Sequence, residues 1–297
     1  MSTDISKHDE VAESPVLLQI RALHQKARDN LIGVKRKIAI VGGKGGVGKS
    51  SVTANLATLL AMDGFQVGVL DADVQGASLA EMLGVPEGDV DSPIKTGFHG
   101  IRVASMGTFF ERRKRQSGSQ PMFMANAAWQ SAMDAGIVRE FVVEAAWGQL
   151  DFLLVDTPPA SWEILSALFG LVPDLEGALI ITQPSNAARS VLDRSLSICE
   201  RLGVPVLGIV ENMAGWECPH CAHTVSLFDQ PEQDKSGADR KNILVSIPYD
   251  PRLGAASRTG TPFADLYPES PAGKALAALA ESLVRLEKEK QSAFKNL

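Results

Sequence analysis

The sequence has little cysteine, no long apolar run and no excess of positive charge. Three cysteines in 297 residues are too few for the disulfide framework of a small secreted protein. No apolar run approaches the roughly 18 residues that a membrane-spanning helix needs. The 29 Lys and Arg residues are outnumbered by 35 Asp and Glu residues, a net charge of −6. That balance argues against a general nucleic-acid binder.

What is present is typical of a globular protein. Hydrophobic residues make up 45% and charged residues 22% of the chain, and the length fits one large α/β domain or two small ones. The first 15 residues are polar and acidic, without the apolar stretch of a secretory signal. We therefore expect a cytosolic protein. Residues 1–35 are interpreted as a polar arm with one short helix, and residues 36–297 as the main domain.

Short apolar segments alternate with amphipathic helical segments along the main domain. The apolar run Lys37–Val41 leads into a glycine cluster, a helical pattern over Ser50–Met62 and a second apolar run, which together form a βαβ unit. Strands are expected at Lys37–Val41, Gln66–Leu70, Ile101–Ser105, Phe152–Val155, Ala178–Thr182, Val206–Val210 and Ile243–Ile247. Further helices are expected at Ala125–Ala146, Ala187–Leu202 and Pro271–Lys290. Loops are expected at Glu111–Met124 and Asp229–Lys241. Seven apolar strands that alternate with helices predict an α/β fold with a doubly wound, mostly parallel sheet and helices on both faces.

The glycine cluster satisfies the pattern G-x-x-x-x-G-K-[ST] over Gly43–Ser50. Its glycines let backbone N–H groups approach phosphate oxygens without a Cβ in the way, and the helix that follows points its positive end at the anion. Lys49 is placed to reach the β- and γ-phosphates and Ser50 to ligate Mg²⁺. Since a strand precedes the motif and a helix follows it, we expect a nucleotide-binding loop.

A second lysine, Lys44, follows the first glycine of this loop. A simple phosphate loop needs no charge at that position. If two subunits face each other, Lys44 can reach the phosphates of the other subunit's nucleotide and supply charge to the transition state, as an arginine finger does. A solvated lysine at the rim of the loop is the alternative.

Three aspartates follow predicted strands at their carboxyl ends: Asp71, Asp73 and Asp156. In a doubly wound sheet, ligands bind at this edge. Asp156 fits the acid that holds Mg²⁺ through water, and Asp73 fits a residue that orients the attacking water. A single strand-end aspartate is as often a helix cap, but their joint position beside the phosphate loop favours catalysis.

Two cysteines, Cys218 and Cys221, form a C-x-x-C pair in a loop after a predicted strand. Two thiolates at this spacing bind one metal from the same side, but a tetrahedral thiolate site needs four ligands and the sequence has no second pair. A two-fold dimer in which each subunit donates both cysteines supplies four. A [4Fe–4S] cluster or a zinc ion fits that set.

Two other interpretations of the pair stay open. His220 and His223 keep a zinc site within one chain possible, because two cysteines and a histidine also bind zinc. A redox-active dithiol is the other interpretation, although such a pair sits at a strand-to-helix turn and no helix clearly follows Cys221. The third cysteine, Cys199, falls inside a predicted helix and is expected in the core.

Taken together, these residues resemble the Mrp/ApbC family of iron–sulfur cluster carriers. That family belongs, with MinD, ParA and the nitrogenase iron protein, to the dimeric P-loop ATPases with a deviant Walker A motif. The resemblance covers roughly Arg36–Tyr267. It rests on GKGGVGKS (Gly43–Ser50), DADVQGAS (Asp71–Ser78), VDTPP (Val155–Pro159), GIVENM with CPHC (Gly208–Cys221) and IPYD (Ile247–Asp250). The phosphate loop with its extra lysine identifies the wider group, and the cysteine block selects the carrier branch.

The resemblance implies a slow ATP hydrolase that uses Mg²⁺ and, as a homodimer, delivers a bridging [4Fe–4S] cluster to apo-proteins. Cys218 and Cys221 of both copies would hold that cluster. The implied catalytic residues are Lys44, reaching across the dimer, Lys49, Asp73 and Asp156. The implied nucleotide-binding residues are Gly43, Gly45, Gly46, Val47, Gly48, Lys49, Ser50, Ser51, Asn212, which would bond adenine, and Pro248, which would flank it.

The chain departs from the family pattern after Asp156. The family continues as D-x-P-P-G-T-x-D, whereas this chain continues as DTPPASWE. Ala160 therefore replaces the glycine whose N–H approaches the γ-phosphate, and it keeps that N–H only in a conformation that tolerates a Cβ. We therefore expect the chain to bind ATP and to hydrolyse it slowly.

The alternative function is a positioning or partition ATPase without a cluster, like MinD or ParA. A MinD-like chain would carry an amphipathic, basic membrane helix at its C-terminal end. Here that segment has Leu276, Leu279, Leu283 and Leu286 but no bulky aromatics, so packing on the domain is expected. ParA-like DNA binding is disfavoured by the acidic charge balance, with only the local patch Arg112–Arg115 in its favour.

Overall fold

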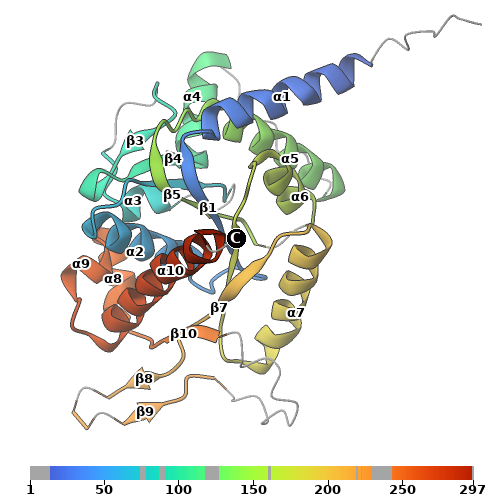
Figure 1. The fold of residues 1–297 in the computed structure, drawn as a ribbon. Helices are drawn as coiled ribbons and strands as arrows, with labels where there is room; N and C mark the ends of the chain where they lie inside the picture. Colours follow the sequence, from blue (N-terminus) through green and yellow to red (C-terminus); the bar gives the residue numbers. More distant parts are fainter. Residues whose placement is uncertain are drawn as a thin grey trace, which may run out of the picture.

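The computed structural model describes residues 14–73, 78–86, 91–117, 127–159, 162–218, 220–221, 223–228 and 243–295. Its centre is an eight-stranded sheet in the order β10-β7-β6-β1-β5-β2-β4-β3 (Figure 1). The strands are β1 (Val34–Val41), β2 (Val67–Asp71), β3 (Lys95–Thr96), β4 (Arg102–Ser105), β5 (Leu150–Asp156), β6 (Gly177–Thr182), β7 (Val206–Asn212) and β10 (Ile243–Ile247). Neighbouring strands are parallel except β3 and β4. The doubly wound, mostly parallel sheet is thus confirmed, and the short edge strand β3 is an addition to the seven expected strands.

Helices cover both faces of the sheet (Figure 1). One layer consists of α2 (Lys49–Met62), α3 (Leu79–Met82), α8 (Pro251–Thr259), α9 (Phe263–Leu266) and α10 (Pro271–Lys295). The other consists of α1 (Pro15–Leu31), α4 (Met106–Ser117), α5 (Ala127–Glu144), α6 (Trp162–Leu171) and α7 (Asn186–Arg201). The 3-10 turn η1 (Phe98–Gly100) contacts α2. In the described part of the chain, no helix is both long enough and apolar enough to cross a bilayer.

The central strand β1 shows why the strands are apolar along their whole length. Successive side chains of a strand point to opposite faces, so both faces need apolar residues when helices cover both. Ile38 and Ile40 pack in the core with α2 and α10, while Ala39 and Val41 pack in the core with α6 and α7.

The last helix packs on the sheet as the sequence predicts. Leu276, Leu279 and Leu283 are fully buried, and they join the core cluster that contains β1 and α2. Helix α10 contacts β10 and α2 along this face. Its apolar stripe is therefore used for packing within the chain and is not presented to a membrane.

The charged segment Glu111–Met124 is the one expected loop that the structure contradicts. Over its first half it is the continuation of α4, which ends at Ser117. Two arginines of this helix lie over the Phe109 ring and form ion pairs with α5, the helix that the sequence predicts at Ala125–Ala146. The ion pairs are Arg112–Glu144 and Arg113–Glu140. Residues 118–126 and the other expected loop, Asp229–Lys241, lie outside the described residues.

An ion pair between Arg36 and Glu176, whose side chains are only 7% and 14% exposed, joins β1 to the loop before β6. The Arg36 guanidinium donates to both carboxylate oxygens of Glu176 at 2.6 and 3.0 Å and to the Leu283 carbonyl at 2.9 Å.

Arg36→Met is expected to lower the free energy of unfolding by about 3 kcal/mol, because Glu176 loses the cation that neutralises it in a buried place. Urea denaturation measures this. The double variant Arg36→Met with Glu176→Gln should recover part of the loss, and equal losses in both variants would contradict the explanation.

Candidate functional site

The phosphate loop lies at the carboxyl edge of the sheet, between β1 and α2. Strand β1 is central, with β5 and β6 on either side, so the loop is surrounded by the ends of the strands that carry the other predicted residues. Gly48 has a φ of +91°, and a Cβ there would lie 2.1 Å from Nδ2 of Asn212. Glycine is therefore required at this position both by the backbone conformation and by the approach of β7.

The predicted magnesium ligands lie together beneath this loop. The Ser50 hydroxyl donates a hydrogen bond of 2.6 Å to Oδ2 of Asp156, the last residue of β5. Lys49, at the first position of α2, is 6% exposed. A serine hydroxyl and a carboxylate are hard oxygen ligands of the kind that Mg²⁺ takes in nucleotide sites. The donor set therefore fits the cation that the sequence predicts.

Two carboxyl groups are buried side by side at this edge. Asp71 of β2 and Asp156 of β5 are register partners. Burial raises the pKa of Asp156 to about 7, opposed by the Ser50 hydrogen bond and the Lys49 charge. Burial, with the nearby Asp156 charge, raises the pKa of Asp71 to about 8. A cation at this edge would favour the ionised form of both groups.

Asp71 anchors the segment that carries the predicted water-orienting acid. Its Oδ1 accepts a hydrogen bond of 3.3 Å from the backbone N–H of Asp73. Its Oδ2 accepts from the backbone N–H of Leu79 at 3.4 Å and from the Ser105 hydroxyl at 3.3 Å. Asp73 lies close enough to Asp156 for its charge to raise the pKa of that residue. The three strand-end aspartates are thus brought together, as predicted.

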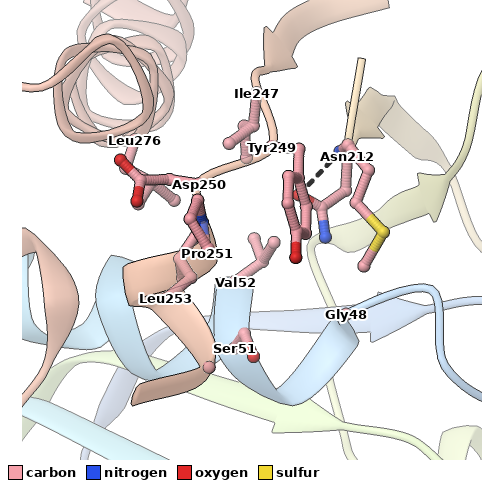
Figure 2. Close-up of a pocket in the computed structure, with 12 residues that line it drawn as sticks. Gly48, Ser51, Val52, Asn212, Ile247, Tyr249, Asp250, Pro251, Leu253 and Leu276 are labelled. Carbon is pink, nitrogen blue, oxygen red and sulfur yellow. Dashed lines mark hydrogen bonds between the residues drawn. The ribbon is translucent and has the colours of Figure 1, made fainter. Parts of the chain in front are cut away.

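A pocket of about 190 Å³ opens beside the start of α2 (Figure 2). It is lined by Gly48, Ser51, Val52, Asn212, Met213, Ile247, Tyr249, Asp250, Pro251, Leu253, Gly254 and Leu276. The walls are mostly apolar, with a few polar groups, as in sites that bind small flat ligands. In Figure 2 the Tyr249 ring stands beside Asn212, and both residues line the pocket. Its position next to the phosphate loop suits the base of a nucleotide.

Asn212 and Pro248, the two residues predicted to contact adenine, do not both line the pocket. Asn212 lines the pocket, and its amide Nδ2 donates to the Val47 carbonyl at 2.9 Å. Pro248 does not line the pocket, whereas its neighbours Ile247 and Tyr249 do. Neither is among the nucleotide-binding residues predicted from the sequence, although both stand in the IPYD stretch (Ile247–Asp250) on which the family resemblance rests. Ile247 ends β10, and Tyr249 lies two residues beyond it.

One wall of the pocket is fixed by an ionised carboxylate. Asp250 caps α8 by accepting the backbone N–H of Arg252 at 3.0 Å. The Arg252 guanidinium also donates to both Asp250 oxygens, at 2.9 and 2.6 Å, and lies 4.4 Å from the centre of the Tyr267 ring. The side-chain hydrogen bond from Arg252 holds the pKa of Asp250 below its ordinary value. These contacts order the first turn of α8, whose residues Pro251, Leu253 and Gly254 line the pocket.

The cysteine pair lies at the tip of a small antiparallel hairpin that projects from the body of the molecule (Figure 1). Its strands are β8 (Trp216–Glu217) and β9 (Thr224–Val225). The backbone N–H of Cys218 donates to the His223 carbonyl at 3.0 Å, which continues the ladder. Cys218 is half-buried, Cys221 is exposed, and both are free thiols. This is a hairpin turn and not the strand-to-helix turn of a redox-active dithiol.

The hairpin favours the thiolate of Cys218. Hydrogen bonds from the backbone N–H groups of His220 and Cys221, and from the Cys221 thiol, hold the pKa of Cys218 below the ordinary value for cysteine. The thiolate is the form that binds metals. Across the residues whose positions are described, no three His, Cys, Asp or Glu side chains gather to hold a metal ion. The single-chain zinc site with His220 or His223 is thus not formed in this structure.

Cys199 lies in α7 and is fully buried. Burial raises the pKa of its thiol to about 11. It is a core residue, as expected, and takes no part in the cysteine hairpin.

The base of the hairpin is attached to the pocket wall. The backbone N–H of Ala214 donates to the Ile247 carbonyl at 2.9 Å, and that of Tyr249 donates to the Gly215 carbonyl at 2.7 Å. The segment between β7 and β8 is therefore bonded to the segment that carries the pocket residues. The structure thus joins the two regions that the sequence singled out.

A sequence model of the family described as "ParA: NUBPL iron-transfer P-loop NTPase" matches residues 33–284. An "Iron-sulfur cluster carrier protein" of Methanococcus maripaludis is 38% identical over 244 residues, which is 79% of this chain and 80% of that protein. The "Cytosolic Fe-S cluster assembly factor NUBP2" of Gallus gallus is 34% identical over 265 residues, 86% of this chain and 94% of that protein.

Solved structures show the same fold. A nucleotide-binding protein from Archaeoglobus fulgidus, in complex with ADP, has a TM-score of 0.61 and 31% identity over 80% of this chain and 91% of its own. The cell division ATPase MinD of Pyrococcus furiosus has a TM-score of 0.58 and 24% identity over 84% of this chain and 99% of its own, and supports the fold alone. From the family match and the identity to these relatives, the chain belongs to the ParA family of P-loop NTPases, in the group described as NUBPL iron-transfer P-loop NTPases.

Proposed function

We propose that this protein is an ATP-dependent carrier that holds an iron–sulfur cluster as cargo and delivers it to apo-proteins. The observation that carries the proposal is the hairpin, which presents Cys218 and Cys221 at the surface and is bonded at its base to the wall of the nucleotide pocket. The two relatives named above, a cluster carrier and a cluster assembly factor, support the proposal.

The nucleotide proposed for this site is ATP with Mg²⁺. Its phosphates would lie on the loop Gly43–Ser50, with the Lys49 ammonium beside them, and Ser51 would follow at the next position of α2. Ser50 would ligate Mg²⁺ directly and Asp156 through water. The base would enter the pocket beside Tyr249 and Asn212. The Archaeoglobus fulgidus relative, solved in complex with ADP, supports nucleotide binding by this chain.

Hydrolysis is proposed to be slow. Asp73 would orient the attacking water, and Lys44 of a second copy would add positive charge at the γ-phosphate. Ala160 and Ser161, which replace the usual residues of the second switch, lie outside the described residues. We expect the replacement of glycine by Ala160 to restrict the backbone conformations in which this N–H would reach the γ-phosphate.

The cargo is proposed to be a [4Fe–4S] cluster shared by two copies of the chain. Each copy offers two thiols from one side, and four thiolates complete the ligand set of such a cluster. The lowered pKa of Cys218 favours its thiolate, the form that binds metals. A zinc ion in the same four-thiolate site is the alternative cargo.

Free thiols suit a reducing compartment, and we propose the cytoplasm as the location.

A cluster-free positioning ATPase fits the chain less well. The apolar stripe of α10 is buried within the chain, and the first two arginines of the patch on α4 are paired with glutamates of α5. The helix stripe that membrane binding would use, and two of the four basic residues that DNA binding would use, are thus engaged in the fold. The family match is to iron-transfer proteins.

Anaerobic reconstitution with iron and sulfide tests the proposal. The protein should take up equal amounts of iron and acid-labile sulfide, and its native mass should be twice that of the chain. Zinc without sulfide in a dimer would replace the cluster as cargo. A monomer that retains neither metal nor sulfide, with or without ATP, would overturn the proposal.

A further inference from the structure

We propose that Gln183 and Asn212 form an amide clamp that holds two successive carbonyls of the phosphate loop outward and connects the loop to Met213, at the base of the cysteine hairpin. Gln183 directly follows β6, and Asn212 ends the neighbouring strand β7. The inference deepens the proposed function, on which it rests, by naming the contacts through which nucleotide and cargo influence each other.

The clamp acts on consecutive peptide groups. The Asn212 amide donates to the Val47 carbonyl at 2.9 Å, and the Gln183 amide lies 3.4 Å from the Gly46 carbonyl. In a trans peptide group the C=O and the following N–H point in opposite directions. Holding the carbonyls of Gly46 and Val47 outward therefore turns the N–H groups of Val47 and Gly48 inward, where an anion binds.

The same two side chains hold Met213. Its backbone N–H donates to Oδ1 of Asn212 at 3.0 Å, and Nε2 of Gln183 lies 3.2 Å from its sulfur. Met213 has a φ of +58°, a left-handed conformation that costs energy in a residue with a side chain and persists only where its surroundings impose it. Met213 lies three residues before Trp216, where β8 begins, so the clamp supports the turn that sets the direction of the hairpin.

These contacts predict a reciprocal effect. Anions that fix the inward N–H groups stabilise the clamped loop, and the clamped loop stabilises the turn at Met213. Because coupling between two binding sites is mutual, a cluster held by the hairpin raises nucleotide affinity by the factor by which the nucleotide raises cluster affinity. One neutral hydrogen bond corresponds to a factor of about 5.

The test uses two replacements that keep the length of the side chain and remove its N–H donors. Gln183→Met is expected to weaken ADP binding about 5-fold, the factor for one hydrogen bond, as measured by calorimetry. Gln183→Glu is expected to weaken it further, because a carboxylate would face the Gly46 carbonyl. Gln149→Met is the matched control, since Gln149 is an exposed glutamine just before β5, at the opposite end of the sheet. Its ADP affinity should equal that of the wild type.

The rate at which iodoacetamide alkylates Cys218 and Cys221 is the second readout. If Gln183 only stabilised the fold, its replacement would not alter the response of this rate to ADP. In the wild type and in Gln149→Met, saturating Mg-ADP should change the alkylation rate. In Gln183→Met that change should be lost, even when the site is saturated and the melting temperature is unaltered. Wild-type ADP affinity or a full ADP effect in Gln183→Met would overturn the clamp alone. A wild type that binds no ADP would overturn the proposed function and the clamp with it.

Discussion

Replacing both Cys218 and Cys221 by serine is expected to abolish iron and sulfide uptake and to leave ATP binding intact. Serine hydroxyls stay protonated near neutral pH and are poor ligands for iron in a sulfide cluster, so a dimer loses all four ligands. The fold of the hairpin should survive, because it is held by the β8–β9 ladder and the bond between the Cys218 N–H and the His223 carbonyl. We expect the iron content after reconstitution to fall by more than about tenfold.

Cys199 provides the matched control for this experiment. It is a free cysteine buried in α7, outside the hairpin. Cys199→Ala should keep the iron and sulfide content of the wild type, although it should lower stability by about 1 kcal/mol through the small cavity it leaves. If the double serine variant keeps its iron, or if Cys199→Ala loses it, the assignment of the cluster to the hairpin is wrong.

Removing Lys44 is expected to lower ATP hydrolysis by a factor of about 1,000, the lower range for a charge supplied across an interface to phosphoryl transfer. Nucleotide binding should change little, because Lys44 is proposed to contact the phosphates of the other copy. Lys49→Ala should instead abolish binding, since Lys49 lies buried beneath its own loop. ATP binding by calorimetry and steady-state phosphate release separate the two variants.

A mixing experiment shows whether Lys44 acts across the dimer. Lys44→Ala and Asp73→Asn should each be inactive alone. In an equal mixture, half of the dimers are mixed, and each has one complete site that combines Asp73 of one copy with Lys44 of the other. Activity should therefore recover to about a quarter of the wild type in a symmetric dimer. A mixture that stays inactive, although mixed dimers form, would place Lys44 in its own subunit's site or at the loop rim.

The sequence by itself determined the features that depend on the pattern of residues within short segments. Alternating apolar runs and helical periods predicted the parallel sheet, because a strand covered on both faces has to be apolar throughout. The phosphate loop could be predicted in the same way, because the pattern G-x-x-x-x-G-K-[ST] specifies both the backbone conformation of the loop and the hydroxyl that ligates Mg²⁺. The aspartates Asp71, Asp73 and Asp156 could be placed at one edge because parallel strands end on the same side of the sheet.

The tertiary structure alone decided the features that depend on contacts between distant segments. Helix α4 forms where the sequence predicts a loop, because its arginines meet glutamates of α5. Tyr249 lines the pocket, and the amides of Asn212 and Gln183 lie on the phosphate loop. The residues that meet in these contacts are far apart along the chain, and only the order and register of the strands bring them within bonding distance. Local periodicity carries no information on strand order or register. The sequence therefore indicates which chemical groups the site contains, and the fold decides which side chains lie together in it.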